Sequence, residues 1–222
     1  GQNLPAKKLD YKVYLIGDAG ASPKGMRSAA LEALRQALQN APKNSAVIFL
    51  GNNAIPDGLP GKKEKGFKKA AHQLKAQLDI LKGYQGQIIF LPGNYDWAAD
   101  GVDGVRRQQK FIEEYLGRED VFLPKDGCSG PEVKELSKKL GLLILDSQWY
   151  MADWDKEPEI NESCETLNRS NFMDEATDAA SDFIGKNLLV VAHHPLYSNG
   201  WHDDHYAPRD HLYPPSDAKP RR

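Results

Sequence analysis

Short apolar runs alternate with helix-like segments through the first half of the chain, and this alternation most constrains the fold. The runs at residues 12–17, 45–51 and 87–94 each lead an apolar stretch into a glycine, as buried strands do. Between them, residues 24–41 and 64–84 place apolar side chains at the spacing of amphipathic helices. This order predicts strands paired in parallel, with crossover helices packed on the sheet.

The second half predicts further elements of both kinds. We expect a helix at 106–117, strands at 130–136 and 141–150, a helix at 171–185 and a last buried strand at 187–195. Residues 1–10 are interpreted as an N-terminal extension and residues 11–200 as one α/β domain. Residues 201–222 are rich in proline, histidine and aspartate without a usable period, which indicates an irregular, partly disordered tail.

Charge and hydropathy exclude two classes of partner. The 29 basic and 31 acidic residues leave a formal net charge of −2, which does not indicate binding to nucleic acid. No apolar run approaches the roughly 20 residues of a membrane-spanning helix, so we expect no transmembrane segment in this chain. The lysines between Lys62 and Lys75 are interpreted as the solvated face of a helix.

The two cysteines, Cys128 and Cys164, lie in loop-like surroundings. A disulfide between them would indicate an oxidising compartment, whereas two free thiols would not, and the sequence alone leaves both open. Two cysteines so far apart do not indicate a zinc site.

Four predicted strands end in polar side chains that can bind a ligand. Asp18, Asn52, Asn94 and His193 each follow an apolar strand within one to three residues. Ligands collect at the carboxyl ends of parallel strands, so these side chains are expected to converge at one edge of the sheet. Taken singly, Asp18 is also explained as a helix cap, the two asparagines as turn residues and His193 as a core histidine. The repetition at successive strand ends favours a shared site.

The motifs GDAG, GNNAIPDG, GNYDW and AHHPLYSNG, in this order, resemble those of the calcineurin-like metallophosphoesterases, most closely the purple acid phosphatase branch. The resemblance implies a layered α/β sandwich with sheets flanked by helices, whose C-terminal part is incomplete in this chain. It also implies metal-dependent hydrolysis of phosphate esters. In the family, two Fe, Mn or Zn ions clamp the ester and supply the attacking hydroxide.

The resemblance assigns roles residue by residue. Asp18 matches a ligand of the first metal, Asn94 a ligand of the second metal and His193 the histidine of the fourth motif. Asp96 matches the acidic residue that supports the histidine of the third motif, and is a candidate catalytic residue.

Other positions depart from the family pattern. Asn52 stands where the resemblance expects the aspartate that bridges the two metals, and a neutral amide cannot replace that anion. Tyr95 stands in place of the third-motif catalytic histidine, and a phenol is a poor proton donor at neutral pH. Ile55 replaces a tyrosine ligand, and the closing G-H-x-H motif does not occur.

These departures predict a phosphoesterase-family domain that has lost catalysis and serves as a scaffold or interaction module. We expect no cofactor, or a single weakly bound divalent metal, and a protein partner of unknown identity. The alternative is an active phosphoesterase with a rearranged or mononuclear site, to which the HDDH stretch at residues 202–205 contributes ligands. A third interpretation, compatible with both, is that the chain is a fragment of a longer protein.

The resemblance extends to bacterial envelope proteins. Together with the potential disulfide, it favours a periplasmic or cell-surface location over the cytoplasm.

Overall fold

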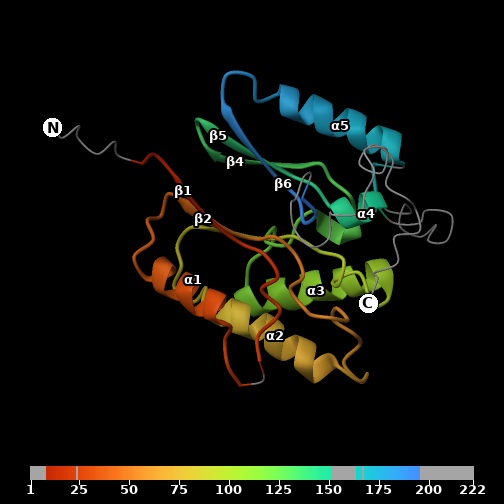
Figure 1. Ribbon diagram of the computed structural model, residues 1–222. Helices are drawn as coiled ribbons and strands as arrows, with labels where there is room; N and C mark the ends of the chain where they lie inside the picture. Colours follow the sequence, from red (N-terminus) through yellow and green to blue (C-terminus); the bar gives the residue numbers. More distant parts are fainter. Residues whose placement is uncertain (1–8, 24, 152–163, 167, 196–222) are drawn as a thin grey trace, which may run out of the picture.

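Two three-stranded sheets lie face to face, with helices on both outer surfaces (Figure 1). The structure is a computed structural model that describes residues 9–23, 25–151, 164–166 and 168–195. Its layers confirm the predicted fold class, an α/β sandwich of sheets flanked by helices. The predicted N-terminal extension and C-terminal tail, including the HDDH stretch, lie almost entirely outside the described residues.

Sheet A contains the three strands predicted from the first half of the sequence. They are β1 (Lys12–Ile16), β2 (Ser45–Phe49) and β3 (Gln87–Phe90), in the order β1-β2-β3. Both pairs are parallel, with Ile16 opposite Phe49 and Phe49 opposite Phe90. The prediction of a parallel β-α-β-α-β unit is therefore confirmed, and the last residues of the three strands lie side by side.

Three helices cover the outer face of sheet A. They are α1 (Ala29–Gln39), α2 (Phe67–Asp79) and α3 (Gly101–Leu116). Helix α1 begins where the Ser28 hydroxyl accepts a hydrogen bond from the backbone N–H of Leu31, so Ser28 rather than Asp18 is its N-cap. The apolar stripe predicted for this helix is buried at Leu31, Leu34 and Leu38.

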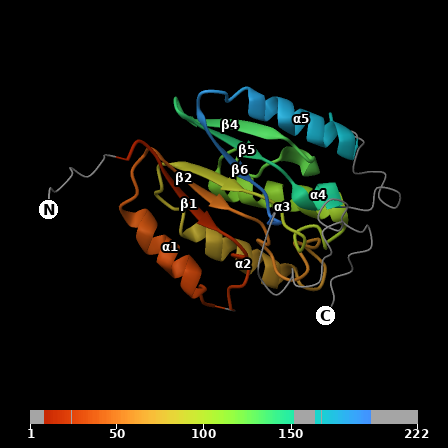
Figure 2. The ribbon, with the colours of Figure 1, turned by 45° about the horizontal axis from the view of Figure 1, so that its top comes forward.

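Sheet B mixes the two strand orientations. It consists of β4 (Glu132–Ser137), β5 (Leu140–Ile144) and β6 (Asn187–Val191), in the order β4-β5-β6. The β4–β5 pair is antiparallel and the β5–β6 pair is parallel. A short 3-10 turn, η1 (Lys125–Gly127), precedes β4, whereas α4 (Ser147–Met151) follows β5 and α5 (Arg169–Ser181) precedes β6. The turned view separates sheet B with α5 from sheet A with α1 and α2 (Figure 2).

The apolar residues form two cores. One lies between sheet A and its helices, where Phe49 and Phe90 stack with their ring centroids 4.1 Å apart. The other lies between the two sheets and includes Ile48, Ile89 and Ile144. Alternation along the strands divides the side chains between these cores.

Two predicted strands differ from the observed ones. The strand expected at 141–150 ends at Ile144, because the buried carboxylate of Asp146 accepts the backbone N–H groups of Gln148 and Trp149 and starts helix α4 instead. The last strand was expected to be buried. It is instead an edge strand, and the side chain of Val190 is 50% exposed.

Cys128 and Cys164 form a disulfide, which decides between the two alternatives left open by the sequence. The bridge joins the end of η1 to the segment that precedes α5, and the loop that it closes contains β4 and β5. None of the described helices is long and apolar enough to cross a membrane.

Candidate active site at the strand ends

The four strand-end side chains converge, but they come from both sheets. Asp18, Asn52 and Asn94 follow the strands of sheet A, whereas His193 follows β6 of sheet B. The expectation that all four meet at the edge of one sheet was therefore wrong. They meet because the two sheets pack face to face with their parallel strands ending near the same point.

Asn52 and Asp18 are joined directly. The Nδ2 group of Asn52 donates a hydrogen bond to Oδ1 of Asp18 over 2.7 Å. The Oδ1 atom of Asn52 accepts the backbone N–H of Tyr95 over 2.9 Å. Asn52 is buried and Asp18 is exposed, so the amide connects a solvent-facing carboxylate to the interior.

Both residues adopt the left-handed backbone conformation, with φ of 51° at Asp18 and 58° at Asn52. Such values are uncommon outside glycine, although asparagine and aspartate tolerate them better than most residues. Backbone strain of this kind clusters at binding and catalytic sites. Here the left-handed backbone directs the side chains of Asp18 and Asn52 toward each other shortly after strands β1 and β2.

Two glycines allow the turns to approach each other. A Cβ atom on Gly51 would lie 2.7 Å from Nδ1 of His193, and one on Gly93 would lie 2.6 Å from the backbone nitrogen of Asn52. No side chain fits at such distances, so glycine is required at both positions.

His193 and Asn94 form the second pair of the site. The Nδ1 atom of His193 lies 2.7 Å from the carbonyl oxygen of Leu50, to which its N–H donates a hydrogen bond. Its Nε2 atom lies 3.0 Å from the side-chain Oδ1 of Asn94. The contact with Leu50 orients the imidazole, so that Nε2 faces the amide of Asn94.

Asp96 is completely buried and organises the turns rather than facing solvent. Its carboxylate accepts hydrogen bonds from the backbone N–H groups of Gly93, Asn53 and Ala54 and from Nε2 of Gln108, over 2.8–3.1 Å. Burial raises the pKa of Asp96 above its ordinary value, and these hydrogen bonds offset only part of that rise. The side chain therefore holds the second and third motifs in one geometry.

Tyr95 lies at the outer surface of the site. Its side chain is 36% exposed, and its hydroxyl has no hydrogen bond with any described residue. Ile55 is half-buried and is held through its backbone, which exchanges two hydrogen bonds with the side-chain amide of Gln73. The Ile55 side chain has no metal-binding atom, and no contact between described residues joins the Tyr95 hydroxyl to the cluster.

Sequence reasoning missed a second layer of polar residues behind the site. The Oδ2 atom of Asp146 accepts a hydrogen bond from Nε1 of Trp97 over 2.9 Å and so joins sheet B to the third motif. The Oγ atom of the next residue, Ser147, lies 2.9 Å from Nδ1 of His194 and accepts a hydrogen bond from the backbone N–H of His194 over 3.0 Å. The signal was available, because Asp146 follows the apolar run LLIL as the other site residues follow their strands.

This second layer contains two strongly shifted titratable groups. Burial raises the pKa of Asp146 to about 7. Burial, together with the adjacent His193, lowers the pKa of His194 to about 4, so its imidazole is neutral at physiological pH. Such shifts are frequent at functional sites, although buried structural groups show them as well.

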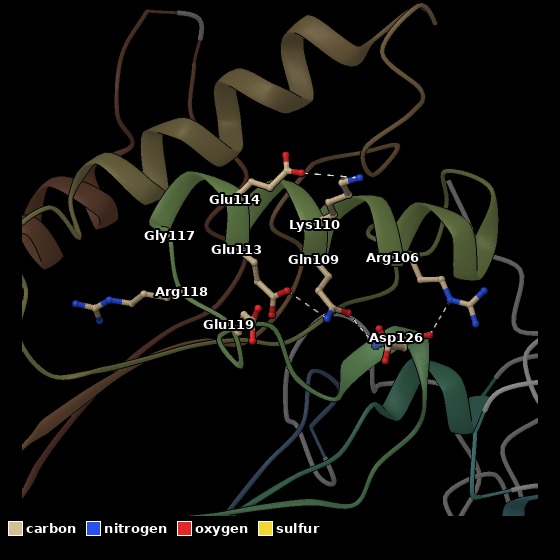
Figure 3. Close-up of a pocket in the computed structure, with 9 residues that line it drawn as sticks. All are labelled: Arg106, Gln109, Lys110, Glu113, Glu114, Gly117, Arg118, Glu119 and Asp126. Carbon is tan, nitrogen blue, oxygen red and sulfur yellow. Dashed lines mark hydrogen bonds and ion pairs between the residues drawn. The ribbon is translucent and has the colours of Figure 1, made fainter.

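An open groove of about 490 Å³ elsewhere on the protein runs along α3 (Figure 3). It shares no residue with the strand-end cluster. Several of its polar side chains bond one another: Lys110 lies 3.8 Å from Glu114, and the side chain of Gln109 bonds Glu113 and the backbone N–H of Asp126. We therefore place the candidate site at the strand ends.

Among the described residues, no three histidine, cysteine or acidic side chains lie close enough together to hold a metal ion. The strand-end cluster consists of one carboxylate, one imidazole and two neutral amides. Its formal charge is therefore only −1 when the imidazole is neutral.

Comparison with known proteins agrees with this architecture. Residues 11–217 match the family model described as calcineurin-like phosphoesterase. A search of curated proteins finds no significant match. Because the family model covers most of the sequence, the chain belongs to the calcineurin-like phosphoesterase family.

Proposed function

We propose that this chain is a phosphoesterase-family domain, most similar to the purple acid phosphatase branch, that has lost dinuclear catalysis and serves as an interaction module. The observation that carries the proposal is the hydrogen bond from Nδ2 of Asn52 to Oδ1 of Asp18. At this position the family is expected to place a carboxylate that binds both metal ions. Here the side chain directs an N–H group at the remaining carboxylate.

The donor set does not fit two divalent ions. The single amide oxygen of Asn52 already accepts the backbone N–H of Tyr95, and its Nδ2 group is a donor that cannot bind a metal. One carboxylate would have to offset two dications, whose mutual repulsion is strong at a separation of about 4 Å. Two ions would therefore leave a large uncompensated positive charge.

The position of the third-motif histidine supports the same conclusion. The Tyr95 side chain is partly exposed and has no described partner that would hold its hydroxyl over a bound ester. Loss of a positioned general acid typically lowers a rate by about 10²–10⁴-fold. Loss of the bridging anion and of this acid together removes the main sources of catalysis.

A second candidate function is hydrolysis with a single metal ion. It is supported by the geometry of Asn94 and His193, whose Oδ1 and Nε2 atoms lie 3.0 Å apart. Two ligand atoms in neighbouring positions around one octahedral ion, each about 2.1 Å from the ion, are separated by nearly this distance. Metal-binding histidines typically donate their other ring N–H to a carbonyl or carboxylate oxygen, as Nδ1 of His193 does to the Leu50 carbonyl. Two ligands are fewer than the three protein ligands of most catalytic zinc sites, which favours the first proposal.

We also propose a periplasmic or cell-surface location, in a bacterial envelope assembly. The disulfide between Cys128 and Cys164 supports this, since such bonds persist mainly in oxidising compartments. The partner in that assembly would be a protein.

Metal stoichiometry tests the proposal. The full chain is incubated with Mn, Fe and Zn, freed of excess metal and analysed for bound ions, and hydrolysis of a chromogenic phosphate ester is measured in parallel. We expect fewer than about 0.1 ion per chain and no turnover above background. Two bound ions with turnover would overturn the proposal.

One bound ion that is lost in His193→Ala and retained in His72→Ala would support the second candidate instead. His72 serves as the control because it contacts the loop at Pro23 and Gly25, away from the strand ends. The double variant Asn52→Asp with Tyr95→His should raise activity little, because the closing histidine motif is still missing.

A further inference from the structure

The disulfide between Cys128 and Cys164 lies next to the second layer of residues behind the strand-end site. Cys128 is followed by Ser129, which is completely buried. The carbonyl oxygen of Ser129 accepts the backbone N–H of Asp146, a completely buried member of that layer, over 2.9 Å. The disulfide is therefore one residue away from a direct contact with the layer that supports the site.

The second cysteine of the bond precedes a contact with the same part of the chain. The Oγ1 atom of Thr166, two residues after Cys164, lies 3.0 Å from the carbonyl oxygen of Gly130. Gly130 in turn packs on the end of β5, since a Cβ atom on it would lie 2.7 Å from the carbonyl oxygen of Ile144. The disulfide thus fastens the chain before α5 to residues that lie against the end of β5.

From Asp146, hydrogen bonds lead to two motifs of the candidate site. Its Oδ2 atom accepts Nε1 of Trp97 in the third motif over 2.9 Å. The Oγ atom of Ser147 accepts the backbone N–H of His194 over 3.0 Å. His194 directly follows His193 of the site, and the two imidazole rings meet edge to face with their centroids 4.8 Å apart. Asp146 and Ser147 therefore connect the disulfide to the third and fourth motifs.

The contacts of Asp146 depend on precise position. None of the ion pairs between described residues includes this carboxylate, which is held by the indole of Trp97 and by the backbone N–H groups of Gln148 and Trp149. Such bonds weaken steeply when donor and acceptor are misaligned. A displacement of the Ser129 carbonyl would therefore disturb the whole set.

Other contacts hold the neighbouring elements independently of the disulfide. Helix α3 holds η1, because Nε of Arg106 donates to the Asp126 carbonyl over 2.9 Å and the N–H of Asp126 donates to Oε1 of Gln109 over 2.8 Å (Figure 3). Strand β4 is held by its pairing with β5. We therefore expect opening of the bond to change the layer behind the site while both sheets stay folded.

We propose that this disulfide is a redox-sensitive switch, which sets the geometry of the strand-end site through Ser129 and Asp146. The closed bond keeps Trp97 and His194 in the positions described above. The open bond releases the Ser129 carbonyl, and the third and fourth motifs lose their alignment. The inference concerns the geometry of the site and does not depend on whether the site has kept catalysis.

A dithiol reductant opens the bond by thiol–disulfide exchange. One thiolate of the reductant attacks Sγ of Cys128, the more exposed cysteine of the pair, and expels Cys164 as a thiolate that takes up a proton. The second thiol of the reductant then displaces Cys128 from the mixed disulfide. The reductant leaves as a disulfide, and the protein has gained two electrons and two protons.

Hydrogen exchange followed by NMR tests the proposal on the full chain, with the bond closed and after reduction by dithiothreitol. The probes are the indole N–H of Trp97 and the backbone N–H groups of Asp146 and His194. The backbone N–H of Leu91 is the internal control, because it bonds the Phe49 carbonyl within sheet A over 2.8 Å.

We expect reduction to accelerate exchange at the three probes at least about tenfold more than at Leu91, and reoxidation to reverse the change. An equal acceleration at all four positions would show that the bond contributes only overall stability. Unchanged exchange at the probes would exclude the coupling, and either result overturns the proposal. In Cys128→Ser with Cys164→Ser, dithiothreitol should have no effect; an acceleration there would place the effect outside the disulfide and also overturn it.

Ser147→Ala tests the route from Asp146 to the fourth motif. The variant removes the acceptor of the His194 backbone N–H and leaves the bond between Trp97 and Asp146 intact. Reduction should then still accelerate exchange at Trp97, but change it at His194 by less than about twofold. A full effect of reduction on His194 in this variant would overturn the route that the proposal requires.

Discussion

Replacing Asn52 with aspartate tests the contact on which the proposed loss of catalysis depends. In the structure, Nδ2 of Asn52 donates to Oδ1 of Asp18 over 2.7 Å. The variant would place a second carboxylate oxygen at that point. It would lose a hydrogen bond to a charged group, about 1.5–3 kcal/mol, and add a repulsion of about 1–4 kcal/mol for charge centres about 4 Å apart. Since Asp18 is exposed, the repulsion lies near its lower limit, and we expect a total loss of about 3 kcal/mol.

Urea unfolding of the wild type and of Asn52→Asp, in EDTA at pH 7.5, measures this loss directly. Asn44→Asp is the matched control, because it adds the same charge at an exposed position that has no carboxylate partner. We expect that control to stay within about 0.5 kcal/mol of the wild type. The deficit of Asn52→Asp should disappear as the pH falls to about 4 and below, where one carboxyl of the pair takes up a proton.

Divalent metal should act in the opposite direction. An added Mn²⁺ ion would relieve the repulsion in Asn52→Asp, so the variant should gain more stability from the metal than the wild type does. A variant that is as stable as the wild type in EDTA at pH 7.5 would refute the described contact between Asn52 and Asp18. Equal metal stabilisation of both proteins would refute the charge argument.

Three further predictions concern the support of the site. Asp96→Ala should lower the free energy of unfolding by at least about 3 kcal/mol in urea, because it leaves three buried N–H groups without an acceptor, whereas exposed Asp57→Ala should change it by less than about 0.5 kcal/mol. Burial raises the pKa of Asp146 to about 7, so between about pH 4 and 7 the folded state keeps the carboxyl proton that the unfolded state releases. As the pH rises from about 4 to 7, the free energy of unfolding of the wild type should therefore fall by up to about 4 kcal/mol relative to that of Asp146→Asn. A difference between the two proteins that does not change with pH would contradict this prediction. The double variant Cys128→Ser with Cys164→Ser opens a loop with a sequence separation of 36 and should lower the melting temperature, with a loss of about 3–4 kcal/mol; an unchanged melting temperature would contradict a bonded pair.

Local patterns predicted the secondary structure where one periodicity dominates. The leucine spacing at Leu31, Leu34 and Leu38 predicted helix α1 and its buried face, since a helix brings residues three and four apart together whatever surrounds it. The prediction failed at residues 145–150, which were expected to continue the strand past the real end of β5. There the side chain of Asp146 and the burial of Trp149 decided the outcome, and neither leaves a periodic signal.

The candidate site was predicted as a list of residues but not as an arrangement. Asp18, Asn52, Asn94 and His193 were identified because each follows a predicted strand. The sequence alone also predicted that Asn52, a neutral amide, stands where a bridging carboxylate is expected. These are properties of residue identity and order along the chain. They also suffice to recognise the family, because its motifs are short and occur in a constant order.

Only the tertiary structure decided how these residues meet. It placed His193 on the second sheet, directed the Asn52 amide at Asp18, and revealed that Asp146 and Ser147 support the site from behind. It also paired the outer side of β3 with the segment after α3, since Phe90 donates its backbone N–H to Val121 and accepts that of Leu123. The physical reason is that hydrogen bonds and edge pairing act over a few ångströms between residues far apart in sequence, so they depend on how whole sheets pack and not on any local pattern.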